Sequence, residues 1–209
     1  MAVLGPDFYD RPVLEVAREL IGCTVAHAGS SGVIVETEAY HESEPACHAF
    51  VGFTARTSVL FGPPGLAYVY RSYGVHALLN AVCEPEGTGA AVLIRALAPL
   101  AGLERMRARR AARGMPALDG RTDAGLCSGP GKLTQALGIE LSENRSSLCS
   151  GPVRIRRDAH EAGELPIVSG PRVGITKAAD LPWRFCLAGD PNVSRPRPAS
   201  WRLPAIHQG

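Results

Sequence analysis

The sequence predicts an α+β fold, a single domain in which a curved antiparallel β-sheet with a protruding β-hairpin is surrounded by a few α-helices. Two observations support this prediction. Most of the expected strands follow one another through short turns, and the expected helices do not alternate with them as regular β–α–β units. The length of 209 residues fits one domain, which we place at residues 1–194, followed by a C-terminal tail at 195–209.

The first third of the chain is expected to contain one helix and two strands. An apolar stripe at helical spacing predicts the helix over 11–22, with Pro12 in its first turn and Gly22 at its end. The elements that follow are strands over 23–27 and 33–40, a turn between them, and a polar loop to about residue 64.

Alternating patterns predict a hairpin and a further strand in the middle of the chain. Gly74 lies in the hairpin turn, where it can adopt a positive φ angle. Pro99 suits the first turn of a helix that is expected to end near Arg113. The expected elements are strands over 66–71, 76–83 and 90–96, helices over 99–113 and 131–137, and strands and turns over 151–201.

The composition is that of an ordinary globular protein, with 45% hydrophobic and 20% charged residues. No apolar run approaches the roughly 18 residues of a membrane span, and the first ten residues lack a signal-peptide pattern. The six cysteines form no CxxC pair, which argues against zinc-ribbon and thioredoxin-like sites and indicates reduced thiols. We therefore expect a cytoplasmic protein with no membrane partner.

Two carboxylates are expected on one face of the strand over 33–40. Because side chains alternate along a strand, Ile34, Glu36, Glu38 and Tyr40 should share a face. Mutual repulsion of neighbouring carboxylates would raise the pKa of one of them, which suits a general base near neutral pH. The alternative from the pattern alone is an edge strand with a solvated acidic face.

A metal site is conceivable in the same region but poorly supported. Its ligands would be Glu38, His41, Glu44 and His48. These residues lack the helical HExxH spacing and a second closely spaced pair of histidines. We therefore expect neither a metal nor another cofactor.

The hairpin carries aromatic residues that predict a ligand contact. Tyr68 and Tyr70 share a face of the first strand, and Tyr68 is expected in the core. Tyr73 lies at the hairpin tip beside Arg71 and has no core to enter. Proteins open duplex DNA through the minor groove with an apolar wedge next to a cation, and Tyr73 with Arg71 fits that pattern. Asn80 on the returning strand lies among apolar residues and needs a hydrogen-bond partner.

Basic residues follow on two helices and one strand. Arg95 ends an apolar strand and is expected to pair with Glu38. Arg105 and Arg109 form a stripe on the helix over 99–113, which is either a solvated basic face or a phosphate-contact surface. Lys132 lies in the first turn of the next helix, where backbone N–H groups attract anions, but the spacing is not that of a P-loop.

Taken together, these segments resemble the alkyladenine (3-methyladenine) DNA glycosylase family. The resemblance covers about residues 5–193 in the family's order and spacing, and its motifs are specific in combination. The matching stretches are VETEAY at 35–40, His48, FGPPG, YVY and YG within 61–74, NAV at 80–82, VLIRALAP at 92–99, GLERMR at 102–107, LCSGPGKLTQALGI at 126–139 and PRVGI at 171–175.

The resemblance implies a monofunctional enzyme that hydrolyses the N-glycosidic bond of damaged purines in duplex DNA and leaves an abasic site. Glu38 matches the family's general base, Arg95 the residue that helps to hold it and the water, and the main-chain carbonyl near Val173 part of the water site. No metal is implied. We expect a monomer whose partner is double-stranded DNA that contains alkylated or deaminated purines.

The remaining matches concern recognition of the base and of the DNA. Tyr40, His48 and Tyr70 match the walls that contact the flipped base. Tyr73 matches the intercalating wedge, and Asn80 the side chain that excludes normal guanine. Residues 50–53 are apolar where relatives usually carry a basic residue.

Two other functions are compatible with parts of the pattern. A carbohydrate hydrolase could use Glu36 and Glu38 as an acid/base pair, since alternate strand positions lie about 6.5 Å apart. A non-catalytic damage-binding module would keep the wedge and would have no need for Glu38.

Overall fold

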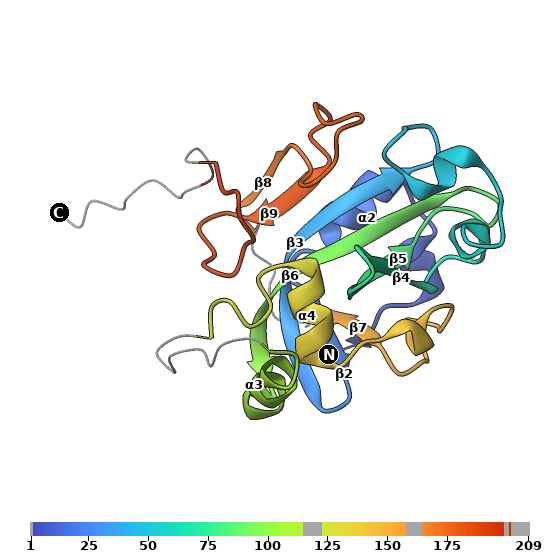
Figure 1. Ribbon diagram of the computed structural model, residues 1–209. Coiled ribbons are helices and arrows are strands. Elements are labelled where there is room, and N and C mark those ends of the chain that lie inside the picture. Colours follow the sequence, from blue (N-terminus) through green and yellow to red (C-terminus); the bar gives the residue numbers. More distant parts are fainter. Residues whose placement is uncertain (1, 115–122, 158–164, 199–200, 202–209) are drawn as a thin grey trace.

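In the computed structural model, which describes residues 2–114, 123–157, 165–198 and 201, nine strands form one antiparallel sheet (Figure 1). The path of the sheet is β1-β7-β2-β3-β6-β5-β4, and β9 pairs with both β3 and β8. The strands are β1 (Ala2–Val3), β2 (Thr24–His27), β3 (Ser30–His41), β4 (Ala67–Ser72), β5 (His76–Val82), β6 (Ala90–Ala101), β7 (Arg154–Arg157), β8 (Ile167–Gly170) and β9 (Arg184–Leu187).

The sheet curls around its two longest strands, β3 and β6, which Figure 1 shows as the long arrows through the middle of the molecule. The first part of β3 pairs with β2, whereas its second part, at 36–38, pairs with β9 on that side. Both parts keep β6 as their other neighbour. The prediction of an α+β fold with a curved antiparallel sheet is confirmed.

Four α-helices pack around this sheet: α1 (Pro6–Tyr9), α2 (Val13–Glu19), α3 (Leu103–Ala111) and α4 (Pro130–Leu137). Residues of α2, α3 and α4 join strand residues in the main core, among them Val16, Ile94, Met106 and Leu133. Three 3-10 turns complete the described elements: η1 (His48–Val51), η2 (Ser58–Phe61) and η3 (Leu141–Glu143). Among the described helices, none is long and apolar enough to cross a bilayer.

The boundary between β6 and α3 was predicted incorrectly. Strand β6 continues through Pro99, which pairs with Gly32 of β3, and the helix begins only at Leu103. Proline fixes φ at a value that both a helix start and a strand end accept, so Pro99 does not mark the boundary. The turn is made instead by Gly102, whose φ of 75° is left-handed.

The start of the predicted C-terminal tail packs on the sheet. The backbone carbonyls of Ser194 and Pro196 accept hydrogen bonds from Arg184 of β9. Trp201 lies against the same guanidinium, 4.8 Å from the ring centroid. Residues 199–200 and 202–209 of the predicted tail lie outside the described residues.

Candidate active site

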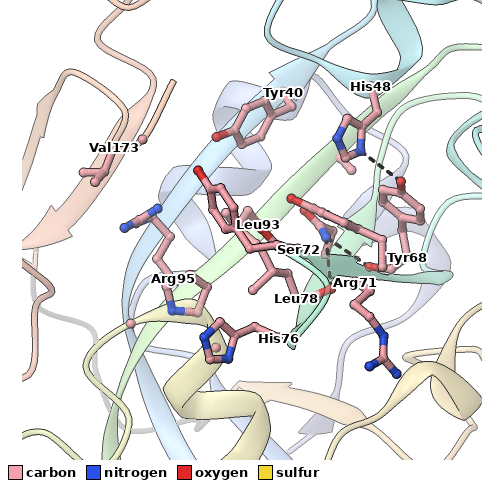
Figure 2. A pocket seen from close by; sticks show the side chains of 18 of the residues that line it. Tyr40, His48, Tyr68, Arg71, Ser72, His76, Leu78, Leu93, Arg95 and Val173 are labelled. Carbon is pink, nitrogen blue, oxygen red and sulfur yellow. Dashed lines mark hydrogen bonds between the residues drawn. The ribbon is translucent and has the colours of Figure 1, made fainter. Parts of the chain in front are cut away.

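A cavity of about 720 Å³ opens between the β4–β5 hairpin, η1, β6, the start of α4 and the loop at 173–175. Figure 2 shows His48 hydrogen-bonded to Tyr68 on one side of this cavity, with Arg95 and Val173 on the other. The predicted site residues that line it are Tyr40, His48, Tyr70, Arg71, Tyr73, Asn80, Arg95, Lys132 and Val173.

Glu38 lies directly behind the cavity wall and is fully buried. One carboxylate oxygen accepts a hydrogen bond from the backbone N–H of Val173, at 2.7 Å. The other accepts from the Tyr40 hydroxyl at 2.8 Å and from Nη1 of Arg95 at 3.3 Å. The ion pair expected between Arg95 and Glu38 is therefore present, and three residues of the cavity wall hold this carboxylate.

The two strand carboxylates have opposite pKa shifts. Burial raises the pKa of Glu38; Arg95, the Val173 N–H and Tyr40 oppose this effect, and the negative charge of Glu36 adds to it. Burial also pushes the pKa of Glu36 upward, but Arg95 and Arg184 outweigh it and the pKa is lowered. Burial, rather than the mutual repulsion that the sequence suggested, is thus the main cause of the raised pKa of Glu38.

The environment of β3 excludes a solvated acidic face. Because β6 and β9 flank Glu36 and Glu38, the strand is internal and neither side chain is exposed. Ile34 does not share their face as predicted: a register shift between Ile34 and Glu36 breaks the alternation, and Ile34 packs in the main core.

Aromatic side chains form one wall of the cavity. Tyr68 and Tyr70 stack with ring centroids 5.2 Å apart, and His48 lies edge-on to Tyr70 at 4.6 Å. Burial raises the pKa of Tyr70 to about 12, and burial together with Arg56 lowers the pKa of His48, so both are neutral at pH 7. This wall suits a flat aromatic ligand.

Tyr68 belongs to a core cluster, as expected, and it also belongs to the site. It is buried, but it lines the cavity and its hydroxyl is 2.9 Å from Nδ1 of His48. The shared face with Tyr70 was the signal in the sequence. Asn80 has the partner that its buried amide requires, because its Nδ2 donates to the Tyr68 carbonyl at 3.0 Å.

Arg172 is a site residue that sequence analysis missed. Its guanidinium donates to both carboxylate oxygens of Glu44 and to the Ala39 carbonyl, and it lies 4.6 Å from the centroid of the Tyr40 ring. It therefore supports Tyr40 and the loop that carries Val173. The sequence shows no periodic pattern around Arg172 that would have revealed these contacts.

The mouth of the cavity is apolar on one side and basic on the other. Tyr73 is 90% exposed at the hairpin tip, and Arg71 donates to the Gly74 carbonyl. Lys132 lies across the cavity with Arg110 of α3. Burial and the nearby positive charges of Arg110 and Arg195 lower the pKa of Lys132, as expected where cations converge.

Arg105 and Arg109 lie away from the cavity. Arg105 donates to the carbonyls of Ala28 and Gly29 in the β2–β3 turn. Arg109 donates to the Ala28 carbonyl and to the last carbonyls of α4, including that of Leu137. Both guanidinium groups thus connect α3 to neighbouring elements, and their contact with phosphate stays a prediction.

The four residues considered as metal ligands have separate partners. Glu38 binds Arg95, Glu44 binds Arg172, His48 binds Tyr68, and His41 lies near Ser43 and Glu84. Within the described part of the chain, no group of three or more His, Cys, Asp or Glu residues could hold a metal ion.

A carboxylate of raised pKa beside an aromatic cavity is an arrangement that can act as a base next to a planar ring, as in a hydrolase. Residues 7–191 match the sequence model of methylpurine-DNA glycosylases. The chain belongs to this family of N-glycosyl hydrolases, which act on DNA in repair.

Its relatives agree with this assignment. A protein of Rhodopseudomonas palustris (strain HaA2) is 56% identical over 198 residues, 92% of each chain. A protein of Methanoculleus marisnigri is 50% identical over 194 residues, 90% of this chain and 96% of the relative. Both carry the name "Putative 3-methyladenine DNA glycosylase".

The raised pKa of Glu38 predicts a conflict between stability and activity. Burial disfavours the charged form of Glu38. Its contribution to the free energy of unfolding is therefore fully present below the pKa that Glu38 has in the unfolded chain. It is lost as the pH rises through the higher pKa that Glu38 has in the folded protein. We expect Glu38→Gln to melt at a higher temperature than wild type at neutral pH. Melting curves over a pH series should show the difference shrinking at acidic pH; a lower melting temperature at neutral pH would contradict the assigned direction.

Proposed function

We propose that this enzyme flips alkylated or deaminated purines out of duplex DNA and hydrolyses their N-glycosidic bond by general-base activation of water. The substrates would be 3-methyladenine, 7-methylguanine, hypoxanthine and ethenoadenine, and the product an abasic site in base excision repair. The protein would act as a monomer, without a metal or other cofactor. The position of Glu38, held by three groups of an aromatic cavity wall, is the observation that carries this proposal.

In the proposed reaction, ionised Glu38 takes a proton from a water molecule whose oxygen bonds to C1′ of the flipped nucleotide. The bond between C1′ and the purine nitrogen breaks, and its electron pair leaves with the base. An alkylated purine is already cationic, so one carboxylate and one water can suffice. Arg95 would keep Glu38 in place, and the carbonyl near Val173 would complete the water site.

The cavity wall would select the base. Tyr40, His48 and Tyr70 would contact the flipped purine, and their ring faces favour a cation over a neutral base. Asn80 would exclude normal guanine by a clash with its exocyclic amine. Its amide is held by the Tyr68 carbonyl, which would keep it from turning away from such a clash.

The mouth of the cavity would contact the DNA. Tyr73, the exposed residue at the hairpin tip, would fill the gap left by the flipped nucleotide and so offset the few kcal/mol that flipping costs. Arg71 and Lys132 would bind phosphates beside that nucleotide. Arg105 and Arg109 would make more distant phosphate contacts from α3.

The two alternative functions account for less of the site. A carbohydrate hydrolase would need Glu36 as a second catalytic carboxylate. Of the partners of Glu36 only Arg95 lines the cavity, whereas all three partners of Glu38 do. A module that only binds damaged DNA would have no use for a carboxylate of raised pKa at the wall of the cavity.

The decisive test is single-turnover release of free base from duplexes that carry hypoxanthine, ethenoadenine or a methylated purine, with a chelator present. We expect wild type to release base and Glu38→Gln to be at least about 100-fold slower, since a general base typically contributes 10²–10⁴-fold. Both proteins should bind the damaged duplex equally well. Tight binding without release by wild type would favour the damage-binding module.

Removal of the wedge should slow flipping. We expect Tyr73→Ala to lower the single-turnover rate by about 10-fold or more, because loss of a base-stacking aromatic costs about 1–3 kcal/mol. The melting temperature should not change, since the side chain is 90% exposed. Val75→Ala, at another exposed apolar position of the hairpin turn, is the matched control. An unchanged rate for Tyr73→Ala would remove the wedge from the mechanism.

The salt dependence of DNA binding should separate near from distant phosphate contacts. Loss of one phosphate contact lowers the slope of log affinity against log salt by about 1. We expect this change for Lys132→Gln and a smaller one for Arg105→Gln, whose guanidinium also binds protein carbonyls. An unchanged slope for Lys132→Gln would place it outside the interface.

A further inference from the structure

Arg95 has three hydrogen-bond partners, and only one of them is the proposed base. Its Nε donates to Glu36 at 2.9 Å, Nη2 donates to the Ser194 hydroxyl at 3.2 Å, and Nη1 donates to Glu38 at 3.3 Å. The contact with Glu38 is the longest of the three. An arginine beside a carboxylate frequently forms two parallel hydrogen bonds with it, whereas here Arg95 gives Glu38 only one.

Glu36 is the centre of this arrangement. It is fully buried and accepts hydrogen bonds from Arg95 at 2.9 Å and from Nε of Arg184 at 2.8 Å. It also accepts from the backbone N–H of Ser194 at 2.7 Å and from the Ser194 hydroxyl at 2.9 Å. One carboxylate thus joins β3, β6, β9 and the segment that follows β9.

That segment, residues 190–197, forms a strap across the back of the active site. Val193 is buried against Val35, Ala96 and Cys186, and the carbonyls of Ser194 and Pro196 bind Arg184. The region that matches the family ends at residue 191, so most of the strap lies outside it. The strap reaches Arg95 across 99 positions of the sequence.

We propose that the strap is a working part of the active site, in which Ser194 and Glu36 act as positioning residues that hold Arg95 so that it gives Glu38 a single, weak contact. This inference rests on the proposed role of Glu38 as the general base. If Arg95 were free to turn, it would bind both oxygens of Glu38, stabilise the ionised carboxylate and reduce its basicity. Glu36 and Ser194 prevent that turn by occupying Nε and Nη2.

The pH dependence of the rate should report this arrangement. The charged and titratable groups that face Glu38 are Arg95 from β6, Glu36 and Tyr40 from β3, and Tyr70 from the hairpin; the Val173 N–H faces it from the loop. Replacing Glu36 by Gln removes a neighbouring negative charge and weakens the hold on Nε of Arg95, because a charge-assisted hydrogen bond becomes one to a neutral amide oxygen. Both changes favour ionised Glu38, so its pKa should fall and the acid limb of the rate profile should move to lower pH.

The test compares Ser194→Ala and Glu36→Gln with Glu19→Gln. Glu19 is also held by two arginines, Arg11 and Arg157, but it does not line the cavity. For each full-length protein we would measure the single-turnover rate against pH, the affinity for damaged duplex, and the titration of the glutamate side chains by ¹³C NMR. Circular dichroism would give the folded fraction used to correct each rate.

For Ser194→Ala we expect a plateau rate about 10- to 150-fold below wild type, the range for loss of one hydrogen bond to a charged group, with duplex affinity within about twofold. For Glu36→Gln we expect a lower plateau, an acid limb at lower pH, and a Glu38 titration shifted in the same direction. Glu19→Gln should match wild type in all three measurements.

Two results would overturn the proposal. One is an unchanged plateau for Ser194→Ala together with an unmoved acid limb for Glu36→Gln. The other is a loss of rate that is fully explained by the folded fraction. If Glu36→Gln does not fold, the plateau of Ser194→Ala decides. Should wild type release no base, the proposed function fails, and the NMR titration of Glu38 in the variants still tests the positioning role.

Discussion

The structure depends on the burial of two carboxylates two positions apart on an internal strand. Removing charge from water costs several kcal/mol per ion unless donors replace the solvent, so Glu36 and Glu38 require partners from several segments. Arg95 serves both, Arg184 and Ser194 complete the shell of Glu36, and Tyr40 and the Val173 N–H complete that of Glu38. The pairing of β9 with β3, the loop before β9 and the strap after it all supply these donors.

The two glutamates differ in function because their shells differ in charge. Glu36 accepts from two guanidinium groups, which holds its pKa down and fixes it as an anion that organises its neighbours. Glu38 accepts from one guanidinium and two neutral donors, so burial prevails and its pKa rises. The same side chain on the same strand is thus a structural anchor at one position and a candidate base two positions further on, and the second guanidinium beside Glu36 is a main cause of this division.

Sequence patterns predicted those parts of the site that depend on local periodicity. Alternation along a strand gave the shared face of Glu36, Glu38 and Tyr40, and the hairpin turn gave the exposure of Tyr73. The missed features depend on contacts between distant segments: the strap at Ser194 lies 158 positions from Glu36, and Arg172 lies 128 positions from Glu44. The register shift near Ile34 was missed because the break in alternation arises from pairing with β6, which no local pattern reveals.

In the proposed reaction, the distribution of hydrogen bonds around Arg95 and Glu38 would let the proposed base be both rigid and reactive. Full pairing of Glu38 with Arg95 would fix its geometry but would stabilise the carboxylate and weaken it as a proton acceptor. In this arrangement neutral donors fix the geometry, since the tyrosine hydroxyl and the backbone N–H make the two shortest bonds to Glu38. The guanidinium is held mainly by groups outside the cavity. Rigidity and basicity are therefore controlled by different partners, and a substitution at Ser194 or Glu36 can change the second while leaving Tyr40 and Val173 in place.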